Sequence, residues 1–256
     1  MTEAIAGTVP VSFASRLGYT LALIGAGLMI LAALVNRLGI ADIGITIPAF
    51  GIGALVALMG VALGLFGVAR GWFSPAVVGG SKGWLAILIG VAAIGITFLI
   101  VSGGLTAPPV HDVTTAPDDP PEFVSLYDVH YAGREYDSFA AYDASRENLD
   151  IAGAYPDLKT LTFEQSVNEV FQAAEAATQS MGWEVAAVVP EEGRIEATAT
   201  TPLFGYKDDV VIRVRTGADD QTELDIRSAS RVGEGDLGAN ANRIRAFTKA
   251  LNNALN

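Results

Sequence analysis

The sequence has 256 residues, a formal net charge of −12 at pH 7 and no cysteine. The absence of cysteine excludes disulfides, thiolate catalysis and cysteine-ligated metals, and the acidic balance argues against nucleic acid as a partner. Residues 1–104 hold four basic and two acidic residues, a net charge of +2, which leaves −14 for residues 105–256. The chain therefore divides into an apolar first part and an acidic second part.

Three long apolar stretches without internal charges predict helices at about 17–36, 47–69 and 83–103. About 20 helical residues cross the hydrocarbon core of a bilayer, so residues 1–104 are predicted to form a three-helix transmembrane domain in a lipid bilayer. The second helix is expected to begin near Pro48, because proline is tolerated in the first turn. No span has an ionisable residue in its interior, which argues against ion-coupled transport.

Small residues recur at three- and four-residue steps in each span, and such seams let helix backbones approach closely. In the second span they are Gly53, Ala57, Gly60, Gly64, Gly67 and Gly71. The pattern fits two arrangements. One is a tight bundle within the chain. In the other, the Gly60–Gly64 and Gly67–Gly71 pairs face a protein partner in the membrane.

Basic residues near the membrane boundaries predict the orientation of the spans. Arg16, Arg70 and Lys82 share one side, whereas the opposite side has only Arg37. The excess of positive charge marks the cytoplasmic side. We therefore expect an integral protein of a bacterial inner membrane with a cytoplasmic N-terminus and a periplasmic C-terminal domain.

Residues 105–122 are rich in proline and are predicted to be an extended linker. Within it, residues 111–115 could add an edge strand. Residues 123–256 are predicted to form one soluble α+β domain.

Four stretches of this domain have the character of strands: residues 183–189, 194–201, 209–215 and 223–227. Three of them alternate strictly between apolar and polar residues, which predicts a four-stranded antiparallel sheet with one buried and one wet face. The polar positions include Arg213, Arg215 and Arg227, which we expect to pair with carboxylates on the wet face.

An amphipathic helix is predicted on each side of the strands. Thr162 and Gln165 have capping-box spacing before an apolar stripe over residues 167–181, and a second stripe covers residues 244–255. Two helices on one face of a sheet give a two-layer domain. This order of elements is similar to helix-grip folds.

Several motifs resemble the family known as domain of unknown function 1499. They are HDVTT at 111–115, YPD at 155–157, GW at 182–183, GRIEA at 193–197, FGYKDD at 204–209, RSASRVG at 227–233 and DLG at 236–238, with Asn240, Arg243 and Ile244. The resemblance covers about residues 105–254. It implies one compact domain, often beside membrane spans, and it implies no activity.

Two segments are candidates for a binding site. Residues Phe204, Tyr206, Lys207, Asp208 and Asp209 are expected in a hairpin connection, where they form either the lip of a ligand cleft or a plug that closes the core. Arg231 and Asp236 lie in a glycine-rich turn before the last helix. That turn either holds an anion or serves only as structure, with Asp236 or Asn240 as the helix cap.

We expect no cofactor and no metal, because the acidic pairs lack the spacing of a calcium loop. The leading hypothesis is a membrane-anchored, non-enzymatic binding module for an apolar, lipid-like ligand or a partner protein. One alternative is an accessory subunit of a larger membrane complex. Another is an envelope hydrolase or lyase, which requires residues such as Lys207, Asp208, Asp209 and His111 to converge in one cleft.

Overall fold

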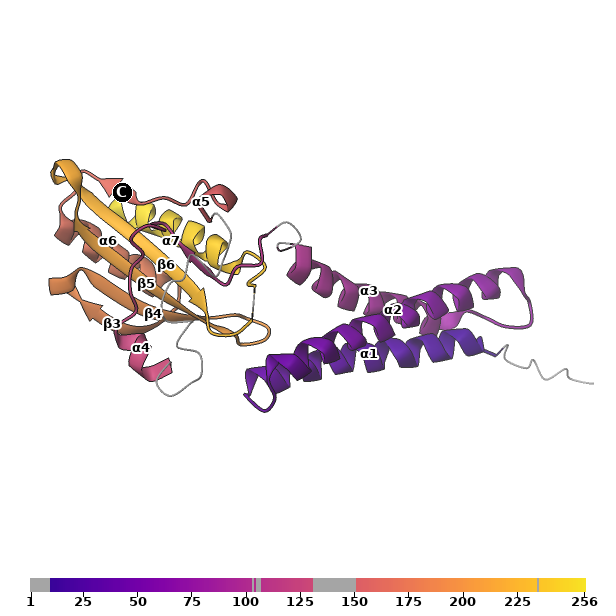
Figure 1. Cartoon of the computed structure of the whole chain (residues 1–256). Helices are drawn as coiled ribbons and strands as arrows, with labels where there is room; N and C mark the ends of the chain where they lie inside the picture. Colours follow the sequence, from indigo (N-terminus) through magenta and orange to yellow (C-terminus); the bar gives the residue numbers. More distant parts are fainter. Residues whose placement is uncertain (1–9, 103, 105–106, 131–150, 234) are drawn as a thin grey trace, which may run out of the picture. The chain divides into compact units, whose positions relative to one another are not determined.

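A computed structural model describes residues 10–102, 104, 107–130, 151–233 and 235–256. The chain divides into two compact units, Met1–Ser102 and Gly103–Asn256. Each unit is described separately below, with the labels of Figure 1.

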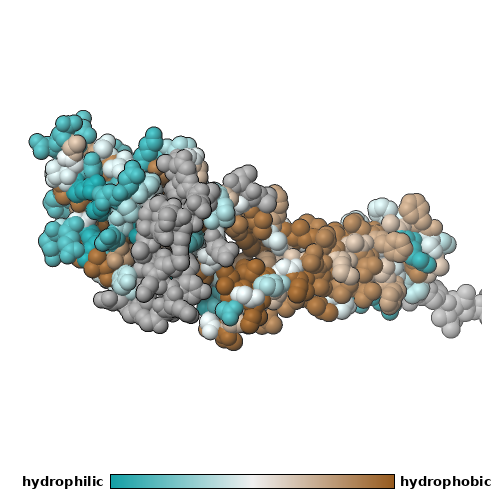
Figure 2. All heavy atoms as spheres, viewed as in Figure 1, coloured by the Kyte–Doolittle hydropathy of each residue, from teal (hydrophilic) through white to brown (hydrophobic). Residues whose placement is uncertain are grey.

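The first unit consists of α1 (Phe13–Arg37), α2 (Ile43–Phe73) and α3 (Gly80–Ser102). All three are long and apolar enough to cross a membrane, and hydrophobic residues dominate their visible surface in Figure 2. The second helix begins at Ile43, five residues before Pro48, rather than near it. Its start is fixed by the carbonyl of Asp42, which accepts the N–H groups of Ile45 and Thr46.

Glycines bring α2 into backbone contact with both neighbouring helices. A Cβ atom at Gly60 would lie 2.6 Å from the amide nitrogen of Ala22 in α1, and one at Gly64 would lie 2.9 Å from Cβ of Ala86 in α3. The other residues of the α2 seam also face parts of the same chain: Gly53 and Ala57 meet Gly25, Gly67 meets Ser15, and Gly71 meets Gly79. The seam glycines, including the Gly60–Gly64 and Gly67–Gly71 pairs, are thus occupied within the chain.

The second unit contains six strands, two more than the four that we expected. They are β1 (Asp112–Thr114), β2 (Leu161–Phe163), β3 (Glu184–Val189), β4 (Arg194–Thr200), β5 (Lys207–Thr216) and β6 (Thr222–Ser230). They form one antiparallel sheet in the order β1-β6-β5-β4-β3, and β2 pairs with β6 as well. The two additional strands have three residues each, too few to show a period. The edge strand suggested by residues 111–115 is confirmed as β1.

The helices of this unit are α4 (Ser125–His130), α5 (Ile151–Ala154), α6 (Val167–Ser180) and α7 (Ala239–Leu255), and the short 3-10 turns Pro190–Glu192 and Ala218–Asp220 join neighbouring strands. The capping box of α6 is Ser166 with Glu169, not Thr162 with Gln165. Thr162 instead belongs to β2. Both pairs have the same three-residue spacing, so spacing alone could not distinguish them.

Helices α6 and α7 cover one face of the sheet (Figure 1). The core between them is filled by buried apolar side chains, among them Val170, Ile212, Ile226, Ile244 and Phe247. Phe247 and Ile244 of α7 are completely inaccessible to solvent. Burying a side chain of this size contributes about 1.5–3 kcal/mol, so this layer provides most of the driving force for folding.

The opposite face of the sheet is polar but not wet, which corrects our expectation. Arg227, Glu196 and Asp225 on this face are at most 1% exposed. Residues 110–126, which we call the cover segment and which include most of the predicted linker, bond with Arg227 and Glu196. Asp225 bonds instead with Thr160 and Arg213. Phe123 and Leu126 of the cover segment form a small second core with Val211 and Ala229 of the sheet.

Charged groups join the cover segment to the sheet. The guanidinium of Arg227 donates to the carboxylate of Asp112, with Nη2–Oδ2 at 2.7 Å, and lies 4.9 Å from the ring centroid of Phe123. The carboxylate of Glu196 accepts the backbone N–H groups of Ser125 at 3.0 Å and Leu126 at 2.9 Å. Because these N–H groups belong to the first turn of α4, Glu196 of strand β4 caps that helix.

Removing one partner of the Asp112–Arg227 pair should destabilise the second unit strongly. We expect Asp112→Ala to lower the free energy of unfolding by about 3–5 kcal/mol, because it leaves a buried guanidinium without its counter-charge. The matched control is Asp157→Ala at the exposed Asp157–Arg245 pair, which should cost at most about 1 kcal/mol. Urea unfolding of the detergent-solubilised chain, followed by Trp183 fluorescence in a Trp72→Phe, Trp84→Phe background, measures both. Equal losses for the two variants would contradict the prediction.

Candidate ligand pocket

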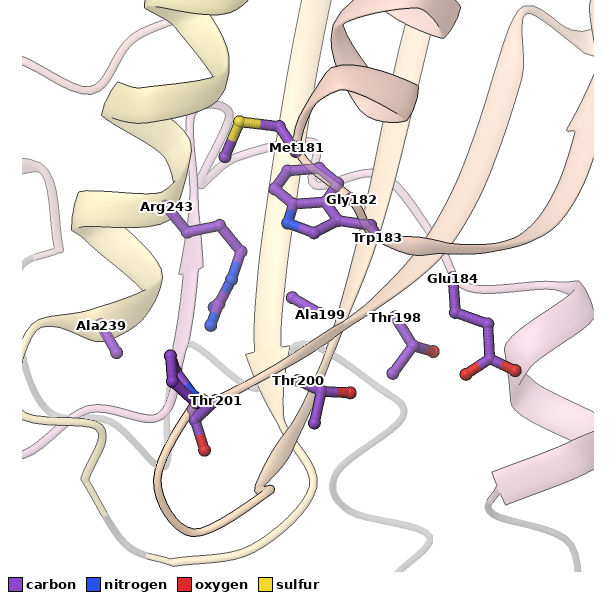
Figure 3. Close-up of a pocket in the computed structure, with 11 residues that line it drawn as sticks. Met181, Gly182, Trp183, Glu184, Thr198, Ala199, Thr200, Thr201, Ala239 and Arg243 are labelled. Carbon is purple, nitrogen blue, oxygen red and sulfur yellow. The ribbon is translucent and has the colours of Figure 1, made fainter.

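An open pocket of about 440 Å³ lies at one end of the core of the second unit, between the end of α6, the end of β4 and the start of α7 (Figure 3). It exists because β3 is shorter than β4. The first residue of β3, Glu184, pairs with Thr198, which leaves Ala199 and Thr200 of β4 without a β3 neighbour. Gly182 has a φ of 67° and turns the chain from α6 into β3 at this point.

Arg243 of α7 provides a fixed positive charge in the pocket lining. Its Nη2 lies 2.5 Å from Oδ2 of Asp208, the second residue of β5. Its Nη1 donates to the hydroxyl of Ser228 at 3.0 Å and to the side-chain oxygen of Asn240. Asp208 is only 3% exposed, so these bonds hold the guanidinium in one orientation in a region of low dielectric.

Asn240 connects the start of α7 to two strands. Its Nδ2 donates to the carbonyl of His111 at 2.9 Å and to the hydroxyl of Ser230 at 3.0 Å. Its Oδ1 accepts from Ser228 at 2.7 Å, in addition to Arg243. The buried amide therefore uses both donors and its acceptor oxygen. This network positions the first turn of α7, and with it Arg243.

Apolar side chains form another part of the pocket lining. Met181 and Trp183 come from the junction between α6 and β3, on the side of the pocket opposite Arg243 (Figure 3). The indole of Trp183 stacks on Phe247, with ring centroids 5.9 Å apart and planes 18° from parallel. Threonines 200 and 201 line the mouth. The pocket thus combines an aromatic wall, hydroxyl groups and one cation.

The residues expected in the loop before β5 do not form one cluster. Phe204 and Tyr206 stack at 5.2 Å in the β4–β5 connection, where Phe204 is buried. Lys207 already belongs to β5, and its Nζ lies 3.9 Å from Glu184 at the pocket rim. Asp208 and Asp209 are also in β5 and not in a turn, so their side chains project to opposite faces.

Asp209 therefore lies on the polar face, away from Asp208. It forms a two-point ion pair with Arg231, with distances of 2.8 Å and 2.7 Å, and Thr198 binds both residues. The hydrolase or lyase hypothesis required at least two of Lys207, Asp208, Asp209 and His111 to meet in one cleft. Asp208 and Asp209 do not meet, and each carboxylate is paired with its own arginine.

The N-cap residue of α7 is Gly238, and Asp236, two residues before it, bonds to the start of the helix. The carboxylate of Asp236 accepts the N–H groups of Gly238 at 2.8 Å and Asn240 at 2.6 Å. Burial raises the pKa of this carboxyl above its ordinary value, and the nearby charge of Asp208 raises it further, against the opposing effect of the two backbone hydrogen bonds. The carboxylate of Asp236 thus occupies the N–H groups that would have to bind an anion. We therefore assign the turn a structural role.

Trp183, Thr200 and Arg243 are pocket residues that our sequence-based site did not include. Asn240 and Arg243 are three residues apart and therefore share one face of α7, a signal that was present in the sequence. Trp183 and Thr200 carried no such signal, because the pocket depends on where β3 stops pairing. Among the described residues, no group of three or more His, Asp or Glu side chains is placed to hold a metal ion.

Comparison with known protein families matches residues 112–251 to the family described as Protein of unknown function (DUF1499). This match covers more than half of the chain, so the chain belongs to that family, and the resemblance in its motifs is confirmed. The matched region begins with β1 and ends within α7, and thus includes the pocket and all of the cover segment except residues 110 and 111. A comparison with curated proteins gives no match.

Asp236 should make the stability of the second unit depend on pH. Since the pKa of Asp236 is raised in the folded state, the folded state binds the proton more tightly, and the contribution of Asp236 to stability increases as the pH falls from neutral toward 3.8. Asp236→Asn lacks this contribution, so the free energy of unfolding of the wild type should rise relative to the variant over that range. Urea titrations at a series of pH values measure the difference.

The matched control is Asp157→Asn, because Arg245 lowers the pKa of Asp157. The stabilisation from a lowered pKa is present above 3.8 and is lost as the pH falls below it. The wild type should therefore lose its advantage over Asp157→Asn on acidification. A difference between wild type and Asp236→Asn that stays constant with pH would contradict the assignment.

Proposed function

We propose that this DUF1499 protein is a membrane-anchored binding module whose second unit recognises a partner protein outside the cytoplasm. The observation that carries the proposal is the contrast between a filled core and an open, preorganised pocket at its end. Apolar side chains occupy the layer between sheet and helices, where Ile244, Phe247 and Leu251 are all fully buried. This arrangement favours recognition at the surface over enclosure of a lipid.

The surface next to the pocket supports a protein partner. Strand β3 is an edge strand of the sheet, and its Val185 and Val188 are 41% and 36% exposed. Exposed apolar side chains beside an aromatic pocket are typical of the central part of a protein interface. The second candidate for the binding partner is a lipid-like ligand that places only a small apolar group against Trp183. The apolar side of the pocket, formed by Met181 and Trp183, supports this candidate as well.

The other roles weighed from the sequence have less support. A role as accessory subunit of a membrane complex is compatible with this proposal, but contact through the α2 glycines would have to displace α1 or α3. An enzymatic role would need a second reactive group beside Arg243 and Asp208. The described residues offer threonine hydroxyls in the pocket lining and the exposed Lys207–Glu184 pair at its rim.

The end of the first unit that contains the starts of α1 and α3 supports the proposed orientation. Exposed aromatic residues gather there on all three helices, namely Phe13, Trp72, Phe73 and Trp84. The basic residues Arg16, Arg70 and Lys82 lie at the same end of the bundle. Aromatic residues are typical of either membrane interface, whereas an excess of basic residues is typical of the cytoplasmic one, so this end of the bundle supports a cytoplasmic N-terminus and, in a bacterial inner membrane, a periplasmic second unit.

The orientation can be tested with single cysteines, because the chain has none of its own. We expect Ser74→Cys, between α2 and α3, to react with a membrane-impermeant maleimide only after the inner membrane is broken. Asp219→Cys, in the exposed turn between β5 and β6, should react in intact spheroplasts. The reverse pattern would overturn the proposed topology and leave the pocket assignment unaffected.

Native mass spectrometry of the full chain, extracted gently from its own membrane, tests the binding role. We expect a retained protein chain that is lost in Thr200→Trp, which fills the mouth of the pocket, and in Trp183→Ala, which removes its wall. Gln172→Trp, on the exposed side of α6, should retain the partner. A retained small mass that organic solvent removes would favour the lipid-like ligand. A bare monomer for the wild type would contradict both candidates.

A further inference from the structure

The end of β4 that extends beyond β3 has backbone groups that restrict what kind of partner can bind there. Thr201 donates its N–H to the carbonyl of Tyr206 at 2.8 Å, and Val214 donates to Gly193 at 2.7 Å. Hydrogen-bonded pairs alternate along an antiparallel ladder, so the odd-numbered residues from Gly193 to Thr201 bond with β5. The N–H and C=O groups of Thr198 and Thr200 therefore point to the other side, toward β3.

Strand β3 reaches only as far as the residue opposite Thr198. Beyond it, the N–H and C=O groups of Thr200 face the pocket, and no strand in the described ranges pairs with them. An unpaired donor and acceptor at a strand end offer a place for another extended backbone. A strand that continues the line of β3 would have room for about two or three residues, given a rise of about 3.3 Å per residue.

The charges around the pocket decide what kind of group can lie there. Arg243 and Glu184 are the charged residues of the pocket lining, and each has a partner of opposite charge, Asp208 for Arg243 and Lys207 for Glu184. The lining therefore has no net positive charge, which disfavours a carboxylate or a phosphate in a partly buried site. The Nε–H group of Arg243 makes no hydrogen bond to the described residues and can donate to a neutral carbonyl oxygen.

We infer that the occupant of the pocket is a short, neutral, extended peptide segment of the partner, which adds to the end of β4 as a strand. Its backbone bonds with Thr200, one of its carbonyls accepts from Arg243, and one apolar side chain lies against Trp183 and Met181. This inference rests on the proposed function and specifies the chemistry of the partner.

The test uses the full chain in phosphatidylcholine nanodiscs. The probe is an acetylated and amidated tripeptide of valine and leucine, and calorimetry measures its binding to wild type and two variants. Thr200→Pro removes the N–H that faces the pocket without removing a bond to β5, and should weaken binding about three- to tenfold, the effect of one net hydrogen bond. Gln172→Ala, on the exposed side of α6 and outside the pocket lining, should bind as the wild type does. The same tripeptide with a free carboxylate should bind more weakly than the blocked one.

Hydrogen exchange gives a second measurement that does not depend on the folding of a variant. On saturation with the blocked tripeptide, the amide of Thr200 in the wild type should become protected, while the amide of Thr201, already bonded to Tyr206, should change little. A probe with an N-methylated backbone should lose this protection.

Two failures are distinguishable. If octyl glucoside, which has no amide, perturbs Trp183 fluorescence while the tripeptide does not, the pocket binds a ligand but the inference of an added strand is overturned. Tripeptide binding that leaves Thr200 unprotected overturns it as well. If neither probe binds and native mass spectrometry finds no partner, the proposed function fails with it.

Discussion

The structure of the second unit depends on the burial of a polar sheet face. One face of the sheet is apolar and packs on α6 and α7, as a two-layer domain requires. The other face carries Arg227, Glu196 and Asp225, and the chain covers it instead of leaving it to water. Moving such ions out of water costs several kcal/mol each, so each must have a partner in the cover segment or in the sheet. Asp112 and the first turn of α4 meet this requirement for Arg227 and Glu196.

This constraint links the two faces of the sheet. The cover segment contains β1 near its start. The carbonyl of His111, adjacent to Asp112, accepts a hydrogen bond from the side-chain amide of Asn240 in α7. The same asparagine positions Arg243 through a shared contact with Ser228. The ion pair under the cover segment and the cation in the pocket are thus connected by β1 and by one buried amide.

The pocket owes its form to a mismatch in strand length and to a fixed charge. Strand β3 ends its pairing before β4 does, and Gly182 directs the chain away from the free strand end. Arg243 is paired with Asp208, and its Nε–H group makes no hydrogen bond to the described residues. We therefore expect a site of this kind to select neutral, hydrogen-bonding partners. In the first unit, by contrast, the small residues are used to pack the helices against one another, so the apolar outer surface is left for lipid.

The sequence by itself determined the features that follow from local periodicity. The three apolar spans, the alternating strands β4 to β6, the stripes of α6 and α7, and the family resemblance were all recognisable, because each rests on residues close together in the chain. Tertiary structure decided the rest. The strands β1 and β2 are too short to show a period and are defined by their partner β6. Alternation distinguishes polar from apolar positions, but it cannot tell whether a polar face meets water or a segment about 100 residues away in the chain. For the same reason, Asp208 and Asp209 looked like one acidic pair in the sequence, while the sheet places one beside Arg243 and the other beside Arg231.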